Sequence, residues 1–350
     1  MTEIGTQFKQ IKIFYDRIED KRYLPFDLFI YSVAEYFDDN FNSPVIFFNN
    51  MEDVLKPTFN LDEIQSQEET QSQEETQTEK PFILIMYLND LGKFIRTHGN
   101  SINENENLLK IIFIHADFIQ NHSLHDQNEI RNFVNDINNK KCIIWEYSSQ
   151  NIFYYKRDYP KIQYYFLPLL YSDYLENFYK SRLENGKIVY KDKDIDILFI
   201  GDYSKERRKD IFEPLKEKYN VVILNETNDY DLIVNTIERS KIFVNPFSKE
   251  TNKAFDYFRL SLLFANKVFV ITETPKVNFK VEKNLLELRD VLVVCNHSNF
   301  HKTIDEYFKK PDDEIHKIVE KTYELFKKYP LYQSLNEFFE THKDSFNRNL

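Results

Sequence analysis

The alternation of apolar runs with helix-prone segments from residue 194 to 273 constrains the fold of this chain more than any other feature. The apolar runs are residues 195–200, 221–224, 241–246 and 267–272. Charged or amphipathic segments separate them, at 202–209, 231–240 and 252–266. Strands that alternate with helices pair in parallel, and ligands bind at the carboxyl ends of such strands. The stretch therefore predicts a parallel sheet with a ligand site along one edge.

A glycine follows the first apolar run directly. Gly201 separates the predicted strand 195–200 from the helix-prone segment 202–209, and the whole chain has only five glycines. Glycine lets the backbone approach a ligand closely, and free amides at a helix start favour an anion. The pattern predicts a phosphate-binding turn, with Asp202 beside it. An ordinary strand-to-helix turn is the alternative.

Polar residues end two further strands of the predicted sheet. Asn245 lies in the last part of the run 241–246, and Glu273 directly follows the run 267–272. Both are predicted to lie beside Gly201 at the carboxyl edge. Glu273 would suit a pair of ribose hydroxyls; a helix cap or a surface acid is its alternative.

Four cations are candidates for balancing a nucleotide diphosphate, whose charge a metal-free site must offset with Arg, Lys and backbone N–H groups. They are Arg207, Arg208, Lys253 and Arg259. Arg207 and Arg208 are also compatible with solvated helix charges, and for Arg208 that is the preferred interpretation. Arg259 stands among apolar residues, where an unpaired buried charge is costly. It is expected to pair with Asp256 or Glu273, or to meet phosphate.

The N-terminal part repeats the strand–helix pattern. Apolar runs predict strands at 11–15, 44–48, 81–86, 109–114, 142–145 and 163–167, with helices at 25–37 and 128–137 and a loop at 100–107. The tandem hexamer QSQEET in the segment 59–80 has no apolar residue and predicts a disordered insertion. After Glu273 the sequence predicts a short helix at 284–288, a fifth strand at 291–295 and helices at 302–309, 312–329 and 331–341.

Length and composition narrow the function classes. A chain of 350 residues favours two domains, and a net charge of −11 argues against a general nucleic-acid binder. The two cysteines, Cys142 and Cys295, each lie in a strand-like run and are expected to be buried, reduced thiols. No signal peptide and no apolar run of about 18 residues is recognisable, so a soluble cytoplasmic protein is expected.

Several motifs together resemble GT-B glycosyltransferases of the group found in bacteria and giant DNA viruses, with a family 1/4-like C-terminal domain. The resemblance covers residues 145–309. The strings that carry it are WEYSSQN at 145–151, LPLLY at 167–171, ILFIG at 197–201 followed by Arg207 and Arg208, FRLSLL at 258–263, and NKVFVITE at 266–273. Leu170 stands where the family usually has glycine.

The resemblance implies two Rossmann-like domains facing across a cleft, with a C-terminal helical tail crossing back. The N-terminal acceptor domain would span 1–172, the nucleotide-sugar domain 173–330, and the returning helix 331–350. The implied function is metal-independent transfer of a sugar from a nucleotide-diphosphate sugar to an acceptor hydroxyl on a glycan or protein. No cofactor and no nucleic-acid partner are expected, and the location would be the host cytoplasm if the protein is viral.

One part of the family pattern is missing. Many retaining enzymes of this type carry two glutamates eight positions apart around the fourth helix, and the corresponding residues here are Lys253 and Ser261. Neither is acidic, so catalytic competence stays open. The segment Asp194-Ile195-Asp196 has the letters of a divalent-metal sugar motif but begins a strand, and it is interpreted as chance.

The candidate residues form two sets. A base for the acceptor hydroxyl would come from the facing domain, because His and carboxylates can serve as general bases; a structural polar residue is the alternative for each. The catalytic candidates are His115, Asp117 and Glu146. The candidate nucleotide-sugar-binding residues are Gly201, Asp202, Arg207, Asn245, Lys253, Arg259, Ser261 and Glu273.

Two competing hypotheses remain. The first is a catalytically inactive GT-B-like protein that binds nucleotide or acts as a scaffold, which the missing acidic pair and the low glycine count favour. The second is an unrelated two-domain α/β protein such as a periplasmic-type small-molecule binder, against which the missing signal peptide speaks.

Overall fold

The computed structural model describes residues 10–15, 24–41, 45–48, 82–87, 108–115, 142–158, 163–180, 193–225, 227, 229–250, 254–275 and 282–347. The expected insertion at 59–80, the loop at 100–107 and the helix at 128–137 lie outside these residues. Two candidate site residues, Asp117 and Lys253, also lie outside them.

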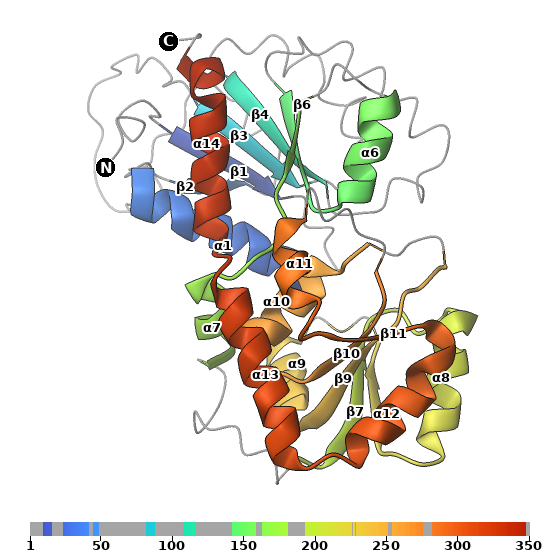
Figure 1. Ribbon diagram of the computed structural model, residues 1–350. Helices are drawn as coiled ribbons and strands as arrows, with labels where there is room; N and C mark the ends of the chain where they lie inside the picture. The colour runs from blue at the N-terminus through green and yellow to red at the C-terminus, as the bar shows by residue number, and fades with distance from the viewer. Residues whose placement is uncertain are drawn as a thin grey trace.

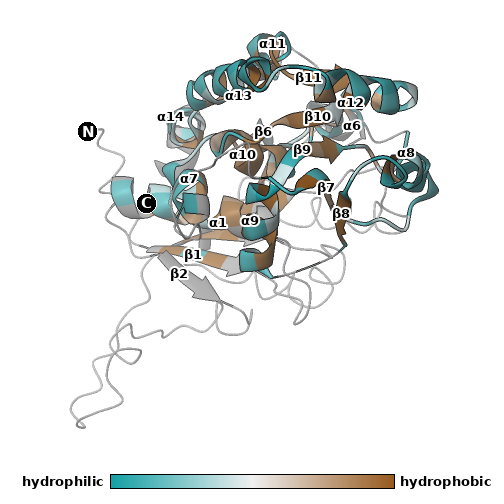
Figure 2. Cartoon of the chain, turned by 90° about the horizontal axis from the view of Figure 1, so that it is seen from below, coloured by the Kyte–Doolittle hydropathy of each residue, from teal (hydrophilic) through white to brown (hydrophobic). Residues whose placement is uncertain are grey.

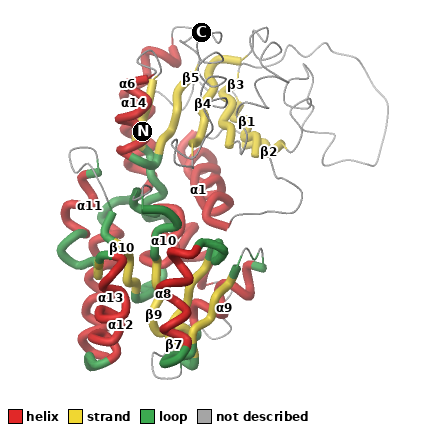
Figure 3. The backbone as a smooth tube through the Cα atoms, turned by 90° about the vertical axis from the view of Figure 1, so that its right-hand side faces the viewer, coloured by secondary structure: helices red, strands yellow, loops and turns green. Residues whose placement is uncertain are grey.

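The described strands form two separate sheets, and every pair of neighbouring strands is parallel (Figure 1). The first sheet has the order β2-β1-β3-β4-β5-β6 and the second has the order β11-β10-β9-β7-β8. The tube in Figure 3 shows the two groups of strands one above the other. The expected α/β class with parallel sheets is confirmed. The domain limits at 172/173 and 330/331 stay predictions.

The strand bounds agree with the apolar runs to within one residue, except that β10 and β11 begin three and two residues later than expected. In the first sheet they are β1 (Gln10–Tyr15), β2 (Val45–Phe48), β3 (Phe82–Tyr87), β4 (Leu108–His115), β5 (Cys142–Glu146) and β6 (Gln163–Phe166). In the second sheet they are β7 (Ile195–Ile200), β8 (Val221–Leu224), β9 (Ser240–Asn245), β10 (Val270–Glu273) and β11 (Val293–Cys295). His115, Glu146 and Glu273 are thus the last residues of strands.

The helices differ more from expectation. Their bounds are α1 (Leu24–Phe41), α6 (Ser149–Asp158), α7 (Asp173–Lys180), α8 (Glu206–Lys216), α9 (Tyr230–Glu238), α10 (Tyr257–Ala265), α11 (Lys283–Leu288), α12 (Phe300–Phe308), α13 (Asp312–Lys327) and α14 (Leu331–Asn347). Helices α6 and α7 were not predicted. Helix α8 begins at Glu206 rather than Asp202, and α10 begins at Tyr257 because the Asp256 side chain accepts from the Arg259 amide and caps it.

Alternating side chains of the second sheet enter two apolar layers, as the period of a strand requires. Ile197 and Phe199 of β7 pack in the cluster that α8 and α12 cover, whereas Leu198 between them belongs to the cluster that contains α9 and α10. Figure 2 shows the apolar strands β7, β9 and β10 between helices with hydrophilic outer faces, such as α8 and α13. The second half is therefore a three-layer sandwich, with helices on both faces of its sheet.

The C-terminal helix packs on the first sheet, far from its neighbours in sequence. The ring of Phe338 on α14 lies edge-on to Trp145 of β5 and to Tyr165 of β6, with centroids 5.1 and 5.0 Å apart. On α1, the Tyr36 hydroxyl donates to Asn336 at 2.7 Å. The first sheet thus buries its Trp145 face with residues from the opposite end of the chain (Figure 1).

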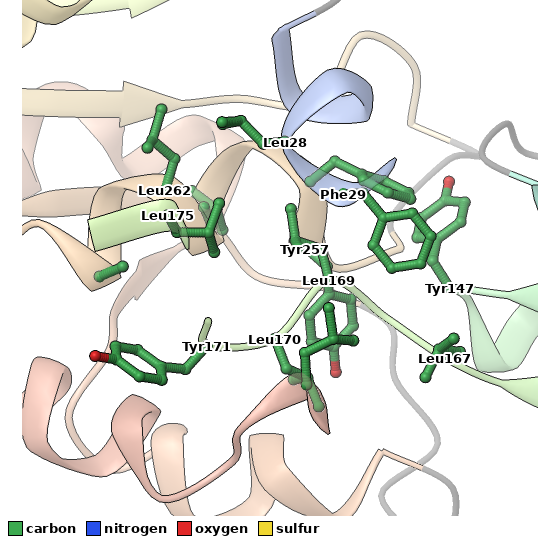
Figure 4. Packing of buried hydrophobic residues seen from close by; sticks show 14 of the residues in the cluster. Leu28, Phe29, Tyr147, Leu167, Leu169, Leu170, Tyr171, Leu175, Tyr257 and Leu262 are labelled. Atoms are coloured by element: carbon green, nitrogen blue, oxygen red, sulfur yellow. The ribbon is translucent and has the colours of Figure 1, made fainter. Parts of the chain in front are cut away.

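The two halves share one apolar cluster. Phe258 of α10 lies 5.6 Å from Phe29 of α1 and 5.3 Å from Tyr147, which follows β5. Figure 4 shows Phe29 and Tyr147 gathered with Tyr257 around the connecting segment Leu167–Tyr171. The cluster runs without interruption from Ile11 of the first sheet to Phe243 of the second. Burial of apolar surface therefore couples the halves thermodynamically.

The chain crosses between the halves at two places that are hydrogen-bonded to each other. The Tyr171 amide donates to the Tyr329 carbonyl at 3.2 Å, and the Leu331 amide donates to the Tyr171 carbonyl at 2.7 Å. These bonds form a parallel bridge between Tyr171 and Pro330. The outgoing and returning segments therefore lie side by side.

We predict that Phe258→Ala destabilises both halves together. A buried Phe→Ala change costs about 3–5 kcal/mol, and here the cavity opens in the shared cluster. Urea unfolding monitored by tryptophan fluorescence, which reports Trp145 in the first half, and by far-UV circular dichroism should give one shifted transition. Leu232→Ala on the exposed side of α9 is the control, with an expected change within about 0.5 kcal/mol. Two separate transitions in the wild type would contradict the coupling.

Candidate functional site

The order of the second sheet creates a reversal between β7 and β9. From β7 the chain goes to β8 on one side and then returns to β9 on the other. In open parallel sheets such a reversal leaves a crevice at the carboxyl ends of the two strands, where ligands bind. Gly201 follows β7 and Asn245 ends β9, so two of the predicted site residues flank this point.

Arg259 connects these two residues. Its Nη1 donates to Asn245 Oδ1 at 2.7 Å, and it pairs with Asp256 at 3.0 Å. A Cβ added to Gly201 would lie 3.1 Å from Arg259 Nη2 and 3.3 Å from Phe199 Cζ, and Gly201 has φ +141°. Any side chain at position 201 would meet the guanidinium. The glycine is therefore required both by the backbone conformation and by the close approach of Arg259.

Arg207 and Glu273 form a forked ion pair across the same edge. Arg207 Nη1 donates to Glu273 Oε2 at 2.6 Å and Nη2 donates to Oε1, while Nη1 also donates to the Phe247 carbonyl at 2.8 Å. Glu273 is only 2% exposed, and its Oε2 accepts a further bond from the Phe247 amide at 3.0 Å. The alternatives of a surface acid and of a helix cap are wrong for Glu273. Both of its oxygens already serve protein donors.

Arg208 is not the solvated charge that sequence analysis preferred. It is 7% exposed, its Nη1 donates to the Asp202 carbonyl at 2.7 Å, and its Nε donates to the Pro246 carbonyl at 3.3 Å. The guanidinium also lies 4.9 Å from the centroid of the Phe199 ring, against which Arg259 lies at 5.8 Å. Backbone carbonyls and a ring face, which charge patterning cannot reveal, account for its burial.

Some backbone amides in the turn between β7 and α8 already donate to side chains of the protein. The Tyr203 amide donates to Asn225 Oδ1 and the Ser204 amide donates to Asp202 Oδ1. The bond from Ser204 and the ammonium of Lys205 lower the pKa of Asp202, which stays ionised at neutral pH. Lys205 provides no side-chain cap for α8. Asp202 therefore stabilises the turn and places a negative charge beside it.

Two candidates have other roles in the structure. Ser261 is buried, and its hydroxyl donates to the Leu169 carbonyl at 2.6 Å, which ties α10 to the connecting segment. Glu146 is fully buried, and its Oε1 accepts from the Ser148 amide at 2.9 Å and from Asn151 Nδ2 at 3.0 Å. Neither side chain joins the group around Gly201. Of His115 the structure gives the backbone position, at the end of β4 beside Glu146 of β5.

Glu282 is a buried carboxylate that sequence analysis missed. It is 2% exposed; its Oε1 accepts from the Ser149 amide at the start of α6, and its Oε2 accepts from the Tyr257 hydroxyl at 3.1 Å. Burial raises its pKa to about 7, against the opposing effect of these two hydrogen bonds, and the charge of Glu146 adds to the rise. It links the first half to the start of α11.

These contacts orient the two sheets. Tyr147 and Ser149, which follow the carboxyl end of β5, meet Phe258 and Glu282, which lie at the starts of α10 and α11. Helix starts in an α/β unit lie at the carboxyl ends of the strands. The carboxyl edges of the two sheets therefore adjoin.

His297 is a second residue that sequence analysis missed. It follows β11 by two residues, next to the edge where Glu273 lies. Burial and the charge of Arg207 lower the pKa of this imidazole. The signal available in the sequence was its place just beyond a predicted strand, which is the same argument that found Glu273.

No cluster of three or more His, Cys, Asp or Glu side chains suited to a metal ion occurs among the described residues. Within the same residues, no helix is long and apolar enough to cross a bilayer. Cys295 is a buried free thiol, as expected, and burial raises its pKa to about 12. Cys142 is placed only by its backbone, in β5.

No family model and no curated protein sequence matches this chain. Among solved structures, the α,α-trehalose-6-phosphate synthase of Burkholderia multivorans aligns with 10% identity over 75% of this chain and 72% of its own, with a TM-score of 0.44. An α-glucosyltransferase solved in complex with UDP-glucose and DNA containing an abasic site aligns with 10% identity over 95% and 99%, with a TM-score of 0.48. Both scores lie below 0.5 and assign neither a family nor an activity.

We predict that Gly201→Ala is destabilised by about 1–3 kcal/mol, the range for a residue forced into a glycine-only conformation. The clash with Arg259 adds to this strain. In the Arg259→Ala background the same change should cost measurably less, because the guanidinium no longer faces the new methyl group. Chemical unfolding of the four proteins of this double-mutant cycle gives the coupling. Equal stability of Gly201→Ala and wild type would contradict the close contact.

We predict that Glu282 makes the free energy of unfolding depend on pH, and that Glu282→Gln removes this contribution. Unfolded glutamate loses its proton near pH 4.5, whereas folded Glu282 keeps it up to about pH 7. The folded state holds the extra proton in this window, so its stability falls as pH rises, by at most about 1.4 kcal/mol per pH unit.

The measurement is urea unfolding from pH 4.5 to 8. Glu282→Gln should reduce the slope of the free energy of unfolding against pH. This variant should also be more stable than the wild type at pH 8. Glu337→Gln, at an exposed position of α14, is the control and should keep the wild-type slope. An unchanged slope in Glu282→Gln would show that Glu282 ionises normally.

Proposed function

We propose that this protein is a glycosyltransferase that binds a nucleotide-diphosphate sugar at the carboxyl edge of the second sheet and transfers the sugar to an acceptor hydroxyl. The supporting observation is Arg259, held between Gly201 and Asn245 where the strand order reverses. A guanidinium at this position, beside a glycine, suits the closely spaced charges of a diphosphate.

Arginine side chains of the protein would balance the negative charge of the diphosphate. Arg207 and Arg259 retain some exposure, with 17% and 12% of their side chains accessible, whereas their carboxylate partners fix where they point. Preorganised guanidinium groups stabilise the charge that builds up on a leaving nucleoside diphosphate. On this basis the proposed reaction requires no metal ion.

The acceptor would approach from the first half. The carboxyl edges of the two sheets adjoin through Tyr147, Ser149, Phe258 and Glu282. In the proposed arrangement the donor lies against the second sheet, and the acceptor lies in the space between the halves. His115, at the carboxyl end of β4, stays the proposed base on that side, with Asp117 close behind it in sequence.

A non-catalytic nucleotide-binding protein of the same architecture is the second candidate. Glu146, one of three proposed bases, is fully buried in structural hydrogen bonds. The positions of the acidic pair are occupied by Lys253 and Ser261, and Ser261 binds the Leu169 carbonyl. These features favour binding without turnover.

The proposal predicts that Arg259→Ala weakens nucleotide binding about 10- to 100-fold, the loss expected for one charge-assisted hydrogen bond. The measurement is the thermal shift of the purified chain with UDP, GDP and ADP and with UDP-glucose and GDP-mannose, followed by calorimetric titration. A ligand at 100 times its dissociation constant stabilises the folded state by about 2.7 kcal/mol, so the rise in melting temperature is readily seen.

The control is Arg239→Ala. Arg239 is 57% exposed and pairs with Asp194 at the amino end of β7, on the opposite edge of the sheet. It should bind nucleotide as the wild type does. If no nucleotide stabilises the wild type, the proposed function is wrong. Binding with neither sugar-nucleotide hydrolysis nor transfer would favour the non-catalytic candidate.

A further inference from the structure

The edge that carries the proposed donor site extends beyond Glu273 to the next strand. Cys295 of β11 lies opposite Glu273 of β10, and the Thr274 amide donates to the Cys295 carbonyl at 2.9 Å. His297 comes two residues later, at the start of a short 3-10 turn that leads into α12. This register places the imidazole on the side of Glu273 that is away from Gly201.

Glu273 is poorly placed to bind a ligand hydroxyl, because it is only 2% exposed and three protein donors already use most of its acceptor sites. Arg207 takes both oxygens in a fork, and the Phe247 amide adds a third bond. Exchanging these bonds for a ribose hydroxyl would leave the Arg207 guanidinium without its carboxylate at a largely buried site. The ribose contact that the sequence suggested for Glu273 therefore needs another side chain.

The His297 ring has an unused polar atom. Its Nδ1 is enclosed and has no hydrogen-bond partner among the described residues, although the side chain as a whole is only half-buried. An enclosed polar atom without a partner costs free energy, and a water, an ion or a functional contact can account for such an atom. A hydroxyl that reaches this ring replaces no existing protein bond.

The charges around the ring indicate which ligand group it suits. Burial and Arg207 disfavour the imidazolium, while Glu273, Asp210 and Glu250 oppose this effect, and the net result is a lowered pKa. The ring is therefore neutral at pH 7, with one donor and one acceptor nitrogen. Such a ring suits a hydroxyl, which both donates and accepts, better than it suits a phosphate.

We propose that His297 is a ligand-binding residue that hydrogen-bonds a ribose hydroxyl of the nucleotide. The proposal rests on the proposed function, because it assumes a nucleotide at this edge. The nucleotide would lie along the carboxyl ends of β7, β9, β10 and β11, with its diphosphate at Arg259 and its ribose at His297. Glu273 then acts through Arg207 and does not contact the ligand.

The test is calorimetric titration of the full chain with UDP, GDP and ADP and with the 2′-deoxy and 3′-deoxy forms of each. The wild type should bind a ribonucleotide about tenfold more tightly than at least one deoxy form, the loss expected for one hydrogen bond. His297→Phe should lower ribonucleotide affinity to the deoxy level and leave that deoxy affinity unchanged. His297→Gln, which keeps a donor and an acceptor, should restore part of the difference.

Two comparisons make the outcome specific. His316→Phe, at a 72% exposed position of α13, should behave as the wild type. Arg259→Ala should weaken ribo and deoxy forms equally, because it acts on the diphosphate. Each variant is first checked for a wild-type melting temperature, and His297→Ala replaces His297→Phe if the latter fails to fold.

Nucleotide binding without discrimination between ribo and deoxy forms, or discrimination that persists in His297→Phe, would overturn this proposal alone. Absence of all nucleotide binding by the wild type would overturn the proposed function, and the role of His297 with it.

Discussion

The approach of the Arg259 guanidinium to the backbone of Gly201 is the contact on which the edge of the second sheet depends. Through this contact Arg259, near the start of α10, reaches the end of β7. The same guanidinium also donates to Asn245 at the end of β9. A largely buried cation needs polar or aromatic partners. Asn245, Asp256 and the Phe199 ring supply them, and the missing side chain at position 201 supplies the space. The fold thus fixes a positive charge where the strand order reverses.

The strands could be predicted from the sequence because each is a local pattern. The run 82–86 is apolar along its length, and Ile83, Leu84 and Ile85 are all buried, as in a strand covered on both faces. The first residues of the helices were harder to predict from the sequence than the strands were. Helix α8 begins four residues later than expected because Asp202 and Asn225 hold the intervening turn through backbone amides. Helix α6 carries mixed aromatic and charged residues, whereas α7 buries Leu175 and Phe178 three positions apart, a helical signal that sequence analysis missed.

The candidate site was predicted in part for the same reason. Strand ends in a parallel sheet share one edge, so Gly201, Asn245 and Glu273 could be grouped without coordinates. The residues that form hydrogen bonds and ion pairs at this edge could not be predicted from the sequence. The pairing of Glu273 with Arg207, the burial of Arg208 against carbonyls, and the contact of Glu282 with Ser149 join residues far apart in sequence. Such contacts depend on how the layers pack, which local patterns do not encode.

The packing of α14 on the first sheet has a consequence for biosynthesis. Residues 331–347 are synthesised after the whole second sheet, yet Phe338 and Phe339 complete the apolar face around Trp145 and Tyr36. Domains usually fold as they emerge, the N-terminal one first. Here the aromatic surface of the first sheet stays uncovered until the second half and α14 have been synthesised. During that interval the uncovered aromatic surface of the nascent first half is available to chaperones.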